Sequence, residues 1–401
     1  MDKKRILFVI YSLGEGGAER SLTNLLNFLP PEKYDIDLQL FSRQGTFLKA
    51  LPAWVNVLDV PHGLYEAYNG FHPHNLGELR WLPIVIERYF WTSVSRMFSK
   101  GHMKRSRQMR WKLSFKRCLP RQRGEYDIAV GYADGEPMYY VVDKVNARRK
   151  IGRICNDYNK SGWDPALDLP YYSALDGLFS VSEGSARIFE SFFPQLAGKA
   201  TVTHNIISPT VVRRMANAFE PEEINKTCFS ILSIGRLCEQ KGYDIALQAL
   251  TLLKQKGFSF QYYIMGIGDD REKLGAMCEK LGLADDVIFL GLKENPYPYI
   301  RACDIILQSS RWEGKSNVLD EAKVLARPIL STNYPTVGDQ IHPGEGMIVD
   351  LTPEAVADGL EDLLTHPEKR LALTAYLADH DYGTEALVQD YIRVLEGISG
   401  D

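Results

Sequence analysis

Short apolar runs alternate with helix-like segments along this chain, and this alternation limits the possible fold more than any other feature. The first run, 5–13, is bounded by glycines, and the residues after it carry apolar side chains at helical spacing. Further strands of a first series are predicted at 35–41, 55–60, 126–132, 149–155, 177–182 and 199–205. Strands of a second series are predicted at 228–237, 260–266, 286–291, 304–310, 327–332 and 346–350. Such alternation is typical of parallel sheets covered by helices.

The two series predict an α/β protein with two doubly wound, Rossmann-like domains that face each other across a cleft. Residues 208–227 combine prolines and charges with weak periodicity, which suits a linker and a short helix. We therefore expect an N-terminal domain over 1–207 and a C-terminal domain over 208–375. The pattern is helical throughout 354–398, and 376–401 is expected to form a helix that packs back on the N-terminal domain. Open α/β sheets bind ligands at the carboxyl ends of their strands, so functional motifs should follow strands.

Composition is that of a globular protein without membrane spans or structural disulfides. Hydrophobic residues make up 45% of the 401 and charged residues 24%. No stretch approaches the ~20 apolar residues that a membrane-spanning helix needs. The six cysteines show no CxxC spacing, which argues for reduced thiols in the cytosol and against structural zinc. Because the first apolar run lacks the cleavage site of a signal peptide, we expect it to be a strand.

Two cations, Arg236 and Lys241, lie in the segment 233–242 directly after a predicted strand. Such a pair on a strand-to-helix loop suits a diphosphate, because arginine offers a planar fork and lysine a point charge. Two solvated surface cations would give the same sequence. Gly266 and Gly268 follow the next strand and would allow a ligand to approach the backbone, although a plain tight turn explains them equally well.

Two glutamates, Glu313 and Glu321, stand eight positions apart around a predicted helix start. Asn317 is the expected N-cap, so Glu313 would lie in the preceding loop and Glu321 in the first turn. Within one helix the pair would be ~12 Å apart, too far to hold one small group. From a loop and a first turn they can hold two parts of one ligand, beside backbone N–H groups at 316–319 that suit a phosphate. The helix dipole alone would account for Glu321 but not for Glu313.

Together these motifs resemble those of the retaining glycosyltransferases of family 4, which have the GT-B fold. The series consists of GGAER near the N-terminus, GRLxxxKG, GxGxxxxxL and two glutamates separated by seven residues, in this order. The resemblance covers nearly the whole chain, and each motif follows a predicted strand. It implies a hexosyltransferase that moves a sugar from a nucleotide-sugar co-substrate, expected to be a UDP-sugar, to a glycan or lipid-linked acceptor. Retention of the anomeric configuration and a role in bacterial surface polysaccharide or glycoconjugate synthesis are also implied.

The resemblance also assigns roles to residues. Arg236 and Lys241 would bind the donor diphosphate, and the charge that develops on this leaving group is what cations stabilise best. Glu321 would hold the ribose hydroxyls and Glu313 would contact the transferred sugar, so that Glu313, Arg236 and Lys241 are the expected catalytic groups. Further donor contacts are expected from Gly16, Gly17, Gly266, Gly268, Ser316, Asn317 and Val318. No other cofactor is expected, and no Asp-x-Asp feature is placed to hold a metal ion.

One position departs from the family pattern. Many relatives carry a histidine in a WIHND-like stretch of the N-terminal domain, whereas this sequence reads RICND with Cys155 at the matching place. A cysteine cannot supply the two-sided hydrogen bonding of a histidine. Asn156 and Asp157 are the neighbouring alternatives for that contact.

Residues 80–123 contain thirteen Lys or Arg and one acid, Glu87, although the chain as a whole has a net charge of −4. Aromatic residues are interleaved with these cations. This composition is typical of an interfacial membrane helix, and also of a solvated helical face. Because family relatives often use lipid-linked acceptors, we favour an anionic membrane and a cytoplasmic protein bound to the membrane's inner face. Nothing else in the sequence supports nucleic-acid binding.

Two other classes of protein fit part of the sequence. An NADP-dependent oxidoreductase would use the glycines after the first strand with Arg43 on the 2′-phosphate, but Glu19 stands where the third glycine of GxGxxG belongs. That class also gives no role to Glu313 and Arg236. A non-enzymatic sugar-binding protein would have a similar cleft but would usually carry a signal peptide.

Overall fold

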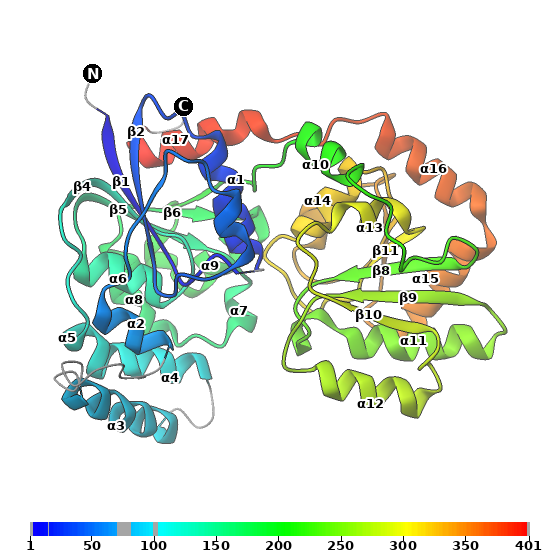
Figure 1. The fold of residues 1–401 in the computed structure, drawn as a ribbon, viewed down its shortest axis with the longest axis horizontal. Helices are drawn as coiled ribbons and strands as arrows, with labels where there is room; N and C mark the ends of the chain where they lie inside the picture. The colour runs from blue at the N-terminus through cyan, green and yellow to red at the C-terminus, as the bar shows by residue number, and fades with distance from the viewer. Residues whose placement is uncertain (1–2, 15, 70–81, 99–102, 399–401) are drawn as a thin grey trace. The chain divides into compact units, whose positions relative to one another are not determined.

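The structure is a computed structural model that describes residues 3–14, 16–69, 82–98 and 103–398. The chain folds into two compact units. The first unit takes the residues up to Asn205 and those from Leu387 onward, and the second takes Ile206–Ala386. Each unit is built on one parallel sheet with helices packed against it (Figure 1). The prediction of an α/β protein with two doubly wound sheets is therefore confirmed.

The first sheet has seven strands in the order β3-β2-β1-β4-β5-β6-β7, and neighbouring strands are parallel. They are β1 (Lys4–Ile10), β2 (Tyr34–Leu40), β3 (Asn56–Val57), β4 (Glu125–Gly131), β5 (Asn146–Ile154), β6 (Gly177–Ser180) and β7 (Ala200–Val202). The chain proceeds outward from β1 on one side and from β4 on the other, so the strand order reverses between them. Such a reversal leaves a crevice at the carboxyl ends of the two strands, where open α/β sheets bind ligands.

The second sheet has six strands in the order β10-β9-β8-β11-β12-β13, again parallel. They are β8 (Phe229–Ile234), β9 (Phe260–Met265), β10 (Val287–Gly291), β11 (Ile305–Gln308), β12 (Ile329–Thr332) and β13 (Met347–Val349). Here the order reverses between β8 and β11. Ile305 and Leu307 enter one hydrophobic core and Ile306 enters the other. Both faces of the sheet are thus buried, which is why its strands are continuous apolar runs in the sequence.

Helices connect the strands in both units. The first unit contains α1 (Gly17–Phe28), η1 (Thr46–Ala50), α2 (His62–Asn69), α3 (Leu82–Phe98), α4 (Met103–Arg110), the π-helical turn η3 (Trp111–Phe115), α5 (Lys116–Cys118), α6 (Glu136–Lys144), α7 (Tyr158–Ser161), α8 (Pro165–Ala174), α9 (Glu183–Phe192), η4 (Pro194–Leu196) and α17 (Val388–Glu396). The second contains α10 (Pro209–Ala216), η5 (Glu239–Lys241), α11 (Tyr243–Gln255), α12 (Arg271–Leu281), α13 (Tyr297–Ala302), α14 (Asn317–Val324), η6 (Val337–Asp339), α15 (Pro353–Thr365) and α16 (Pro367–Ala378). The turn η7 (Glu385–Leu387) leads back to the first unit.

The pattern predicted that the C-terminal segment is helical throughout, and this prediction is wrong. Residues 379–384, between α16 and η7, are not helical. In this stretch the Thr384 amide donates to the Ile207 carbonyl at 3.1 Å, and the Ile207 amide donates to the Thr384 hydroxyl at 2.8 Å. A helical backbone could not make this extended pairing with the other connecting segment. The sequence placed domain boundaries at 207 and 375, and the structure keeps residues 376–386 with the second unit.

Helix α17 packs on the first unit although it comes from the end of the chain (Figure 1). Its Tyr391 hydroxyl accepts a hydrogen bond from Arg153 at 2.9 Å, and Arg153 is 1% exposed at the end of β5. The same guanidinium donates to Asn205, where the chain leaves the first unit, at 2.8 Å. One buried cation therefore contacts both the last residue of the unit's N-terminal part and the helix that the C-terminal segment adds to it.

Candidate functional site

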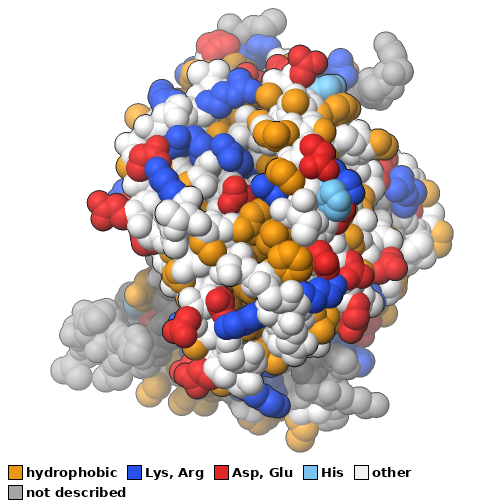
Figure 2. Space-filling view, turned by 90° about the vertical axis from the view of Figure 1, so that its right-hand side faces the viewer, with side chains coloured by type: hydrophobic (Ala, Val, Ile, Leu, Met, Phe, Trp, Pro, Cys, Tyr) orange, Lys and Arg blue, Asp and Glu red, His pale blue; other side chains and the backbone are white. Residues whose placement is uncertain are grey.

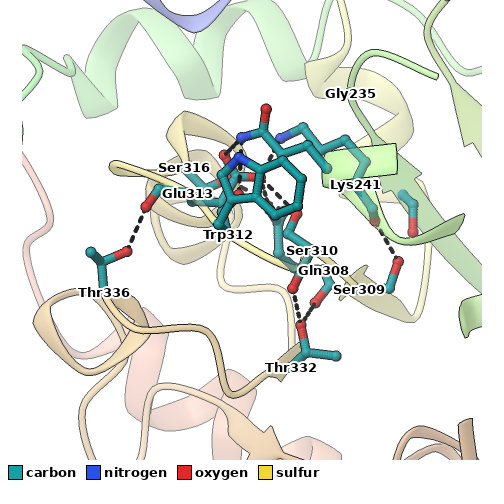
Figure 3. Close-up of polar contacts among 12 residues, drawn as sticks. Gly235, Lys241, Gln308, Ser309, Ser310, Trp312, Glu313, Ser316, Thr332 and Thr336 are labelled. Carbon is teal, nitrogen blue, oxygen red and sulfur yellow. Dashed lines mark hydrogen bonds and ion pairs between the residues drawn. The ribbon is translucent and has the colours of Figure 1, made fainter. Parts of the chain in front are cut away.

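The cations and acids predicted to bind a donor in the second unit lie on both sides of its strand-order reversal. Arg236 follows β8 by two residues and Lys241 ends the turn η5, whereas Glu313 lies in the loop between β11 and α14. This is the edge of the sheet at which a doubly wound domain binds ligands. The structure brings Lys241 and Glu313 into direct contact, and Figure 3 shows their side chains pointing toward each other.

The Glu313 carboxylate is 6% exposed and held by four side chains. Its Oε1 accepts from Lys241 Nζ at 2.6 Å, from the Ser310 hydroxyl at 2.6 Å and from Gln308 Nε2 at 3.0 Å. Gln240 Nε2 donates to Oε2 at 3.3 Å. A buried carboxylate is tolerated when it is paired and hydrogen-bonded in this way. Glu313 is therefore a fixed negative charge at the edge of the sheet.

The turn that carries Lys241 is fastened to the loop after β11 by a second set of contacts. Arg311 makes a two-pronged ion pair with Asp244, at 2.8 and 2.6 Å. The Ser309 hydroxyl donates to the Lys241 carbonyl at 2.9 Å, and Gln240 Nε2 donates to the Trp312 carbonyl at 2.9 Å. Two loops far apart in the sequence thus form one rigid surface, which is a requirement for holding a ligand in fixed geometry.

Helix α14 begins at Asn317, but its N-cap is Ser316 and not Asn317 as predicted. The Ser316 backbone is extended, and its hydroxyl donates to the Gln308 side chain at 3.3 Å instead of capping the helix. The Ser316 amide, one of the predicted donor contacts, donates to the Gln340 side-chain oxygen at 3.0 Å. The Val318 amide lies in the first turn, where an α-helix offers no intrahelical acceptor and where anions bind.

Glu321 and Arg236 lie in opposite environments. Glu321 is 2% exposed, and its Oε1 accepts from the Tyr297 hydroxyl at 3.5 Å. Arg236 is exposed, and among the described residues no hydrogen bond or ion pair holds its guanidinium. A cation of this kind at the end of a strand is available to an anionic ligand.

Gly266 and Gly268 bring the loop after β9 against the loop after β8. A Cβ atom on Gly266 would lie 2.0 Å from the Gly235 carbonyl oxygen, and one on Gly268 would lie 2.3 Å from the Leu237 carbonyl oxygen. The Leu237 amide donates to the Ile267 carbonyl at 2.9 Å across the same contact. Packing of the two loops therefore explains both glycines without a ligand, as the tight-turn interpretation allowed.

Gly16 and Gly17 lie in the first unit, at the start of α1 just after β1. A Cβ atom on Gly16 would lie 2.1 Å from a carboxylate oxygen of Glu19, so this acid covers the N-terminus of its own helix. A dinucleotide would place its pyrophosphate at that helix N-terminus, where a carboxylate would repel it. The geometry thus disfavours the oxidoreductase alternative. Arg43, the proposed 2′-phosphate partner, forms an exposed ion pair with Asp59 at 3.1 Å.

Sequence reasoning missed Asp134, which follows β4 at the reversal of the first sheet. The Cys155 amide donates to both of its carboxylate oxygens, at 3.4 and 3.3 Å, and the Asn156 side chain also hydrogen-bonds to it. Burial raises the pKa of Asp134 to about 6. Burial, with the nearby Asp134 charge, also raises the pKa of the Cys155 thiol to about 12, so this thiol stays neutral. Asp157, the other alternative, is used as the N-cap of α7.

Part of the basic segment 80–123 is held against the rest of the first unit by ion pairs. Residues 80–81 and 99–102 lie outside the described residues. Several cations from α4 onward pair with acids of the same unit: Arg105 with Asp164 at 3.2 Å, Arg110 with Glu136 at 2.6 Å and Lys116 with Asp143 at 2.8 Å. The aromatic Trp111 and Phe115 are buried in its core. These contacts hold α4 and η3 on the first unit, whereas most of the exposed apolar side chains of the segment lie on α3 and one, Met103, lies on α4.

Three observations bear on metals, membranes and nucleic acids. Among the described residues, no group of three or more His, Cys, Asp or Glu could hold a metal ion. No helix in the same part of the chain is long and apolar enough to cross a bilayer. On the face drawn in Figure 2, acidic and basic described side chains are interspersed, with apolar ones between them. Proteins that bind nucleic acid usually concentrate their cations on one face, and the face drawn in Figure 2 is not such a face.

Comparison with known proteins finds a family model that matches most of the second unit. Residues 215–379 match the family model of glycosyl transferases group 1. An uncharacterised glycosyltransferase of Methanocaldococcus jannaschii is 30% identical over 171 residues, which are 41% of this chain and 42% of that protein. A Campylobacter jejuni enzyme, N-acetylgalactosamine-N,N'-diacetylbacillosaminyl-diphospho-undecaprenol 4-alpha-N-acetylgalactosaminyltransferase, is 28% identical over 177 residues, 41% of this chain and 48% of that enzyme. The chain thus spans about half the length of these curated relatives.

Solved structures resemble the chain over nearly its whole length. Anabaena HepE in complex with UDP-glucose has a TM-score of 0.68 at 15% identity, covering 98% of this chain and 100% of HepE. WaaG, a glycosyltransferase involved in lipopolysaccharide biosynthesis, has a TM-score of 0.62 at 16% identity, covering 98% of this chain and 100% of WaaG. At these identities the likeness shows the shared fold.

Proposed function

We propose that this protein is a glycosyltransferase that moves a sugar from a nucleotide-sugar donor to a hydroxyl of a surface glycan or a lipid-linked saccharide. The observation that carries the proposal is the Lys241–Glu313 pair, 2.6 Å apart at the strand-order reversal of the second unit. It lies within residues 215–379, which match the family model. HepE, which shares the fold, is described in complex with UDP-glucose, and this supports a UDP-sugar as donor.

The residues at the carboxyl edge of the second sheet would each contact the donor. Arg236, exposed after β8, would meet the diphosphate first, and the Val318 amide would donate to it from the first turn of α14. Lys241 would contact the same diphosphate while it stays paired with Glu313. Buried Glu321 would accept hydrogen bonds from the ribose hydroxyls, and Glu313 would contact the transferred sugar. The positive groups stabilise most strongly the charge that develops on the leaving diphosphate.

The same groups support transfer with retention and without a bound metal ion. The C1–O bond to the leaving phosphate breaks as the acceptor oxygen attacks C1 from the same face. The acceptor proton passes to the leaving phosphate oxygen, so the protein need not supply a base for this step. Arg236, Lys241 and the amides of α14 supply positive charge that a divalent cation supplies in other transferases. The anomeric configuration of the product and the rate in EDTA test these two points.

A lipid-linked acceptor fits a membrane-facing surface on the first unit. The exposed apolar residues of α3 recur at helical spacing, with exposures from 39% to 71%, and they are Leu82, Ile86, Tyr89, Phe90 and Met97. Arg96, Lys112 and Arg117 are exposed cations in the same segment. An apolar helix face combined with nearby cations suits the surface of an anionic bilayer. We propose that α3 docks the protein on the inner face of the membrane.

The direct test is a binding and turnover screen of nucleotides and nucleotide sugars. Thermal unfolding should shift upward with UDP or another nucleoside diphosphate and stay unchanged with NADPH. A ligand at 100 times its Kd stabilises the folded state by ~2.7 kcal/mol, which such a measurement resolves. Mass spectrometry should then detect release of the nucleoside diphosphate from one of the sugar donors. Stabilisation by NADPH alone would contradict the proposal.

A further inference from the structure

The loop between β12 and β13 supports the loop that carries Glu313. The Thr332 hydroxyl, at the end of β12, donates to the Ser310 carbonyl at 2.7 Å, and the Thr336 hydroxyl donates to the Glu313 carbonyl at 2.8 Å (Figure 3). Both threonines are buried, so water does not compete for these carbonyl groups. The backbone that leads from β11 to α14 is thus held at regular intervals by one neighbouring loop.

Gln340 continues this series of contacts at Ser316 and is itself buried. Its Oε1 accepts from the Ser316 amide at 3.0 Å, and its Nε2 donates to the Ser316 carbonyl. The same Nε2 donates at 2.9 Å to Oδ1 of Asp320, in the first turn of α14. A glutamine side chain has two N–H donors and one acceptor oxygen, and all three are engaged, which leaves one orientation for this amide group. Gln340 therefore holds both backbone groups of the N-cap residue of α14.

A buried ion pair fixes the position of Gln340 in turn. Lys323, near the end of α14, donates to the Gln340 carbonyl and, at 2.5 Å, to Oε2 of Glu345. This carboxylate oxygen also accepts from the His342 amide at 2.9 Å. A buried pair is strongly destabilising to break, because the remaining charge would be left without a partner. The loop after β12 is thus joined to α14 at both ends of the helix.

Ser316 stands between two groups to which the proposed function gives donor contacts. Glu313 lies three residues before it and the Val318 amide two residues after it. A shift of the Ser316 backbone would move both groups, and a misplacement of about 1 Å can cost about 100-fold in rate. The Ser316 amide is already bonded to Gln340, so the structure gives this residue a different use from the donor contact predicted for it.

We propose that Gln340 is a positioning residue of the donor site, which directs the first amides of α14 and the Glu313 loop toward the donor without touching it. This inference rests on the proposed function. The role needs a side chain that accepts from one backbone group and donates to another, as a carboxamide does. Glutamate has the same size, but its ionised form has no donor and would face the Ser316 carbonyl and the Asp320 carboxylate.

The test compares a nucleoside diphosphate with its own nucleoside. UDP, GDP and ADP are titrated calorimetrically into the full chain, and the tightest binder is then compared with its nucleoside, whose weaker binding is followed by nuclear magnetic resonance. We expect Gln340→Glu to weaken diphosphate binding at least tenfold and to leave the nucleoside Kd within twofold, because the α14 amides would contact only phosphate. Gln261→Glu, near the amino end of β9, is the matched control and should match the wild type.

Two further measurements separate positioning from a general loss of stability. Val356 of α15 is fully buried in the hydrophobic core, so Val356→Ala should lower the melting temperature and leave the diphosphate Kd unchanged. In the wild type without nucleotide, hydrogen exchange at the Ser316 amide should be slow, because this amide donates to the Gln340 side chain. The exchange measurement needs no substitution.

The outcomes distinguish this inference from the function on which it rests. Undiminished diphosphate affinity in Gln340→Glu would overturn the inference, and so would an equal loss for the nucleoside or a loss of the same size in Val356→Ala. Should Gln340→Glu not fold, slow exchange at Ser316 in the wild type would support the inference and fast exchange would overturn it. If no nucleoside diphosphate binds the wild type, the proposed function is contradicted, and this inference with it.

Discussion

Lys241 Nζ lies 2.6 Å from Glu313 Oε1, and this pair joins the loop after β8 to the loop after β11. The two side chains are 18% and 7% exposed, so the contact is largely shielded from water. A lysine that binds phosphate and a glutamate that binds sugar were predicted as separate contacts. In the structure the two side chains form one ion pair, in which each neutralises the charge of the other.

This pairing predicts coupled effects on stability. Lys241→Ala leaves the Glu313 carboxylate buried with hydrogen bonds but no counter-charge, and should lower the free energy of unfolding by about 1–3 kcal/mol. Adding Glu313→Gln should recover part of this loss, since a neutral amide needs no counter-charge. Urea denaturation of the two single variants and the double variant measures the coupling. Losses that add to within about 0.5 kcal/mol would show that the pair is not coupled.

Substitutions of Glu321 and Glu313 should change different kinetic parameters. Glu321→Ala should raise the donor KM more than it lowers kcat, because a ribose contact is equally strong in the ground state and the transition state. Glu313→Gln should lower kcat chiefly, because this carboxylate would contact the sugar that is transferred. Steady-state rates at varied donor concentration distinguish the two patterns. Small and equal effects of both substitutions would show that the two glutamates stabilise the helix and the loop and do not bind the donor.

Gly266 and Gly268, which follow β9, should be needed for the packing of the two loops and not for ligand binding. Gly268→Ala places a methyl group 2.3 Å from the Leu237 carbonyl oxygen, and the backbone shift it forces should cost about 1–3 kcal/mol of stability. Gly338→Ala is the control, because no atom lies within 4 Å of its added Cβ. Thermal unfolding of both variants checks the contrast. If Gly268→Ala keeps wild-type stability and loses only donor affinity, the glycine serves a ligand instead.

Helix α3 should carry the membrane contact. Substituting Ile86, Phe90 and Met97 with serine should abolish sedimentation with anionic vesicles while donor hydrolysis stays unchanged. In the wild type this binding should weaken as salt shortens the Debye length to ~3 Å at 1 M. Leu371→Ser, which changes a side chain 69% exposed on the second unit, is the control. If the triple variant still binds the vesicles, α3 is not the membrane-docking surface.

The cations of α4 are poor targets for the same experiment. Arg105 and Arg110 pair with Asp164 and Glu136, so their replacement would disturb the fold as well as the surface charge. The composition of residues 80–123 could not reveal these ion pairs, because the acids that pair with Arg105 and Arg110 come from other segments. Long-range pairing of this kind leaves no periodic pattern in the local sequence.

Most strands could be predicted because they are short apolar runs whose residues are largely buried. Every predicted run in the two series overlaps an observed strand, and the loop position of Glu313 followed from the predicted start of α14. The N-cap was placed one residue late, because asparagine and serine are equally favoured at an N-cap. What distinguishes Ser316 is a long-range contact, since its amide donates to the side chain of Gln340, 24 positions along the chain. Asp134 was missed because its significance depends on the spatial order of strands, which the sequence does not display.

The central claim, that the cations after β8 bind the diphosphate of a nucleotide sugar, is tested most directly by calorimetric titration. UDP and the best sugar nucleotide are titrated into the wild type, Arg236→Ala and Lys241→Ala, with circular dichroism to verify the fold of each. A charge-assisted contact contributes about 1.5–3 kcal/mol, so each variant should bind at least tenfold more weakly than the wild type. Undiminished affinity in both folded variants, or no binding of any nucleoside diphosphate to the wild type, would contradict the claim.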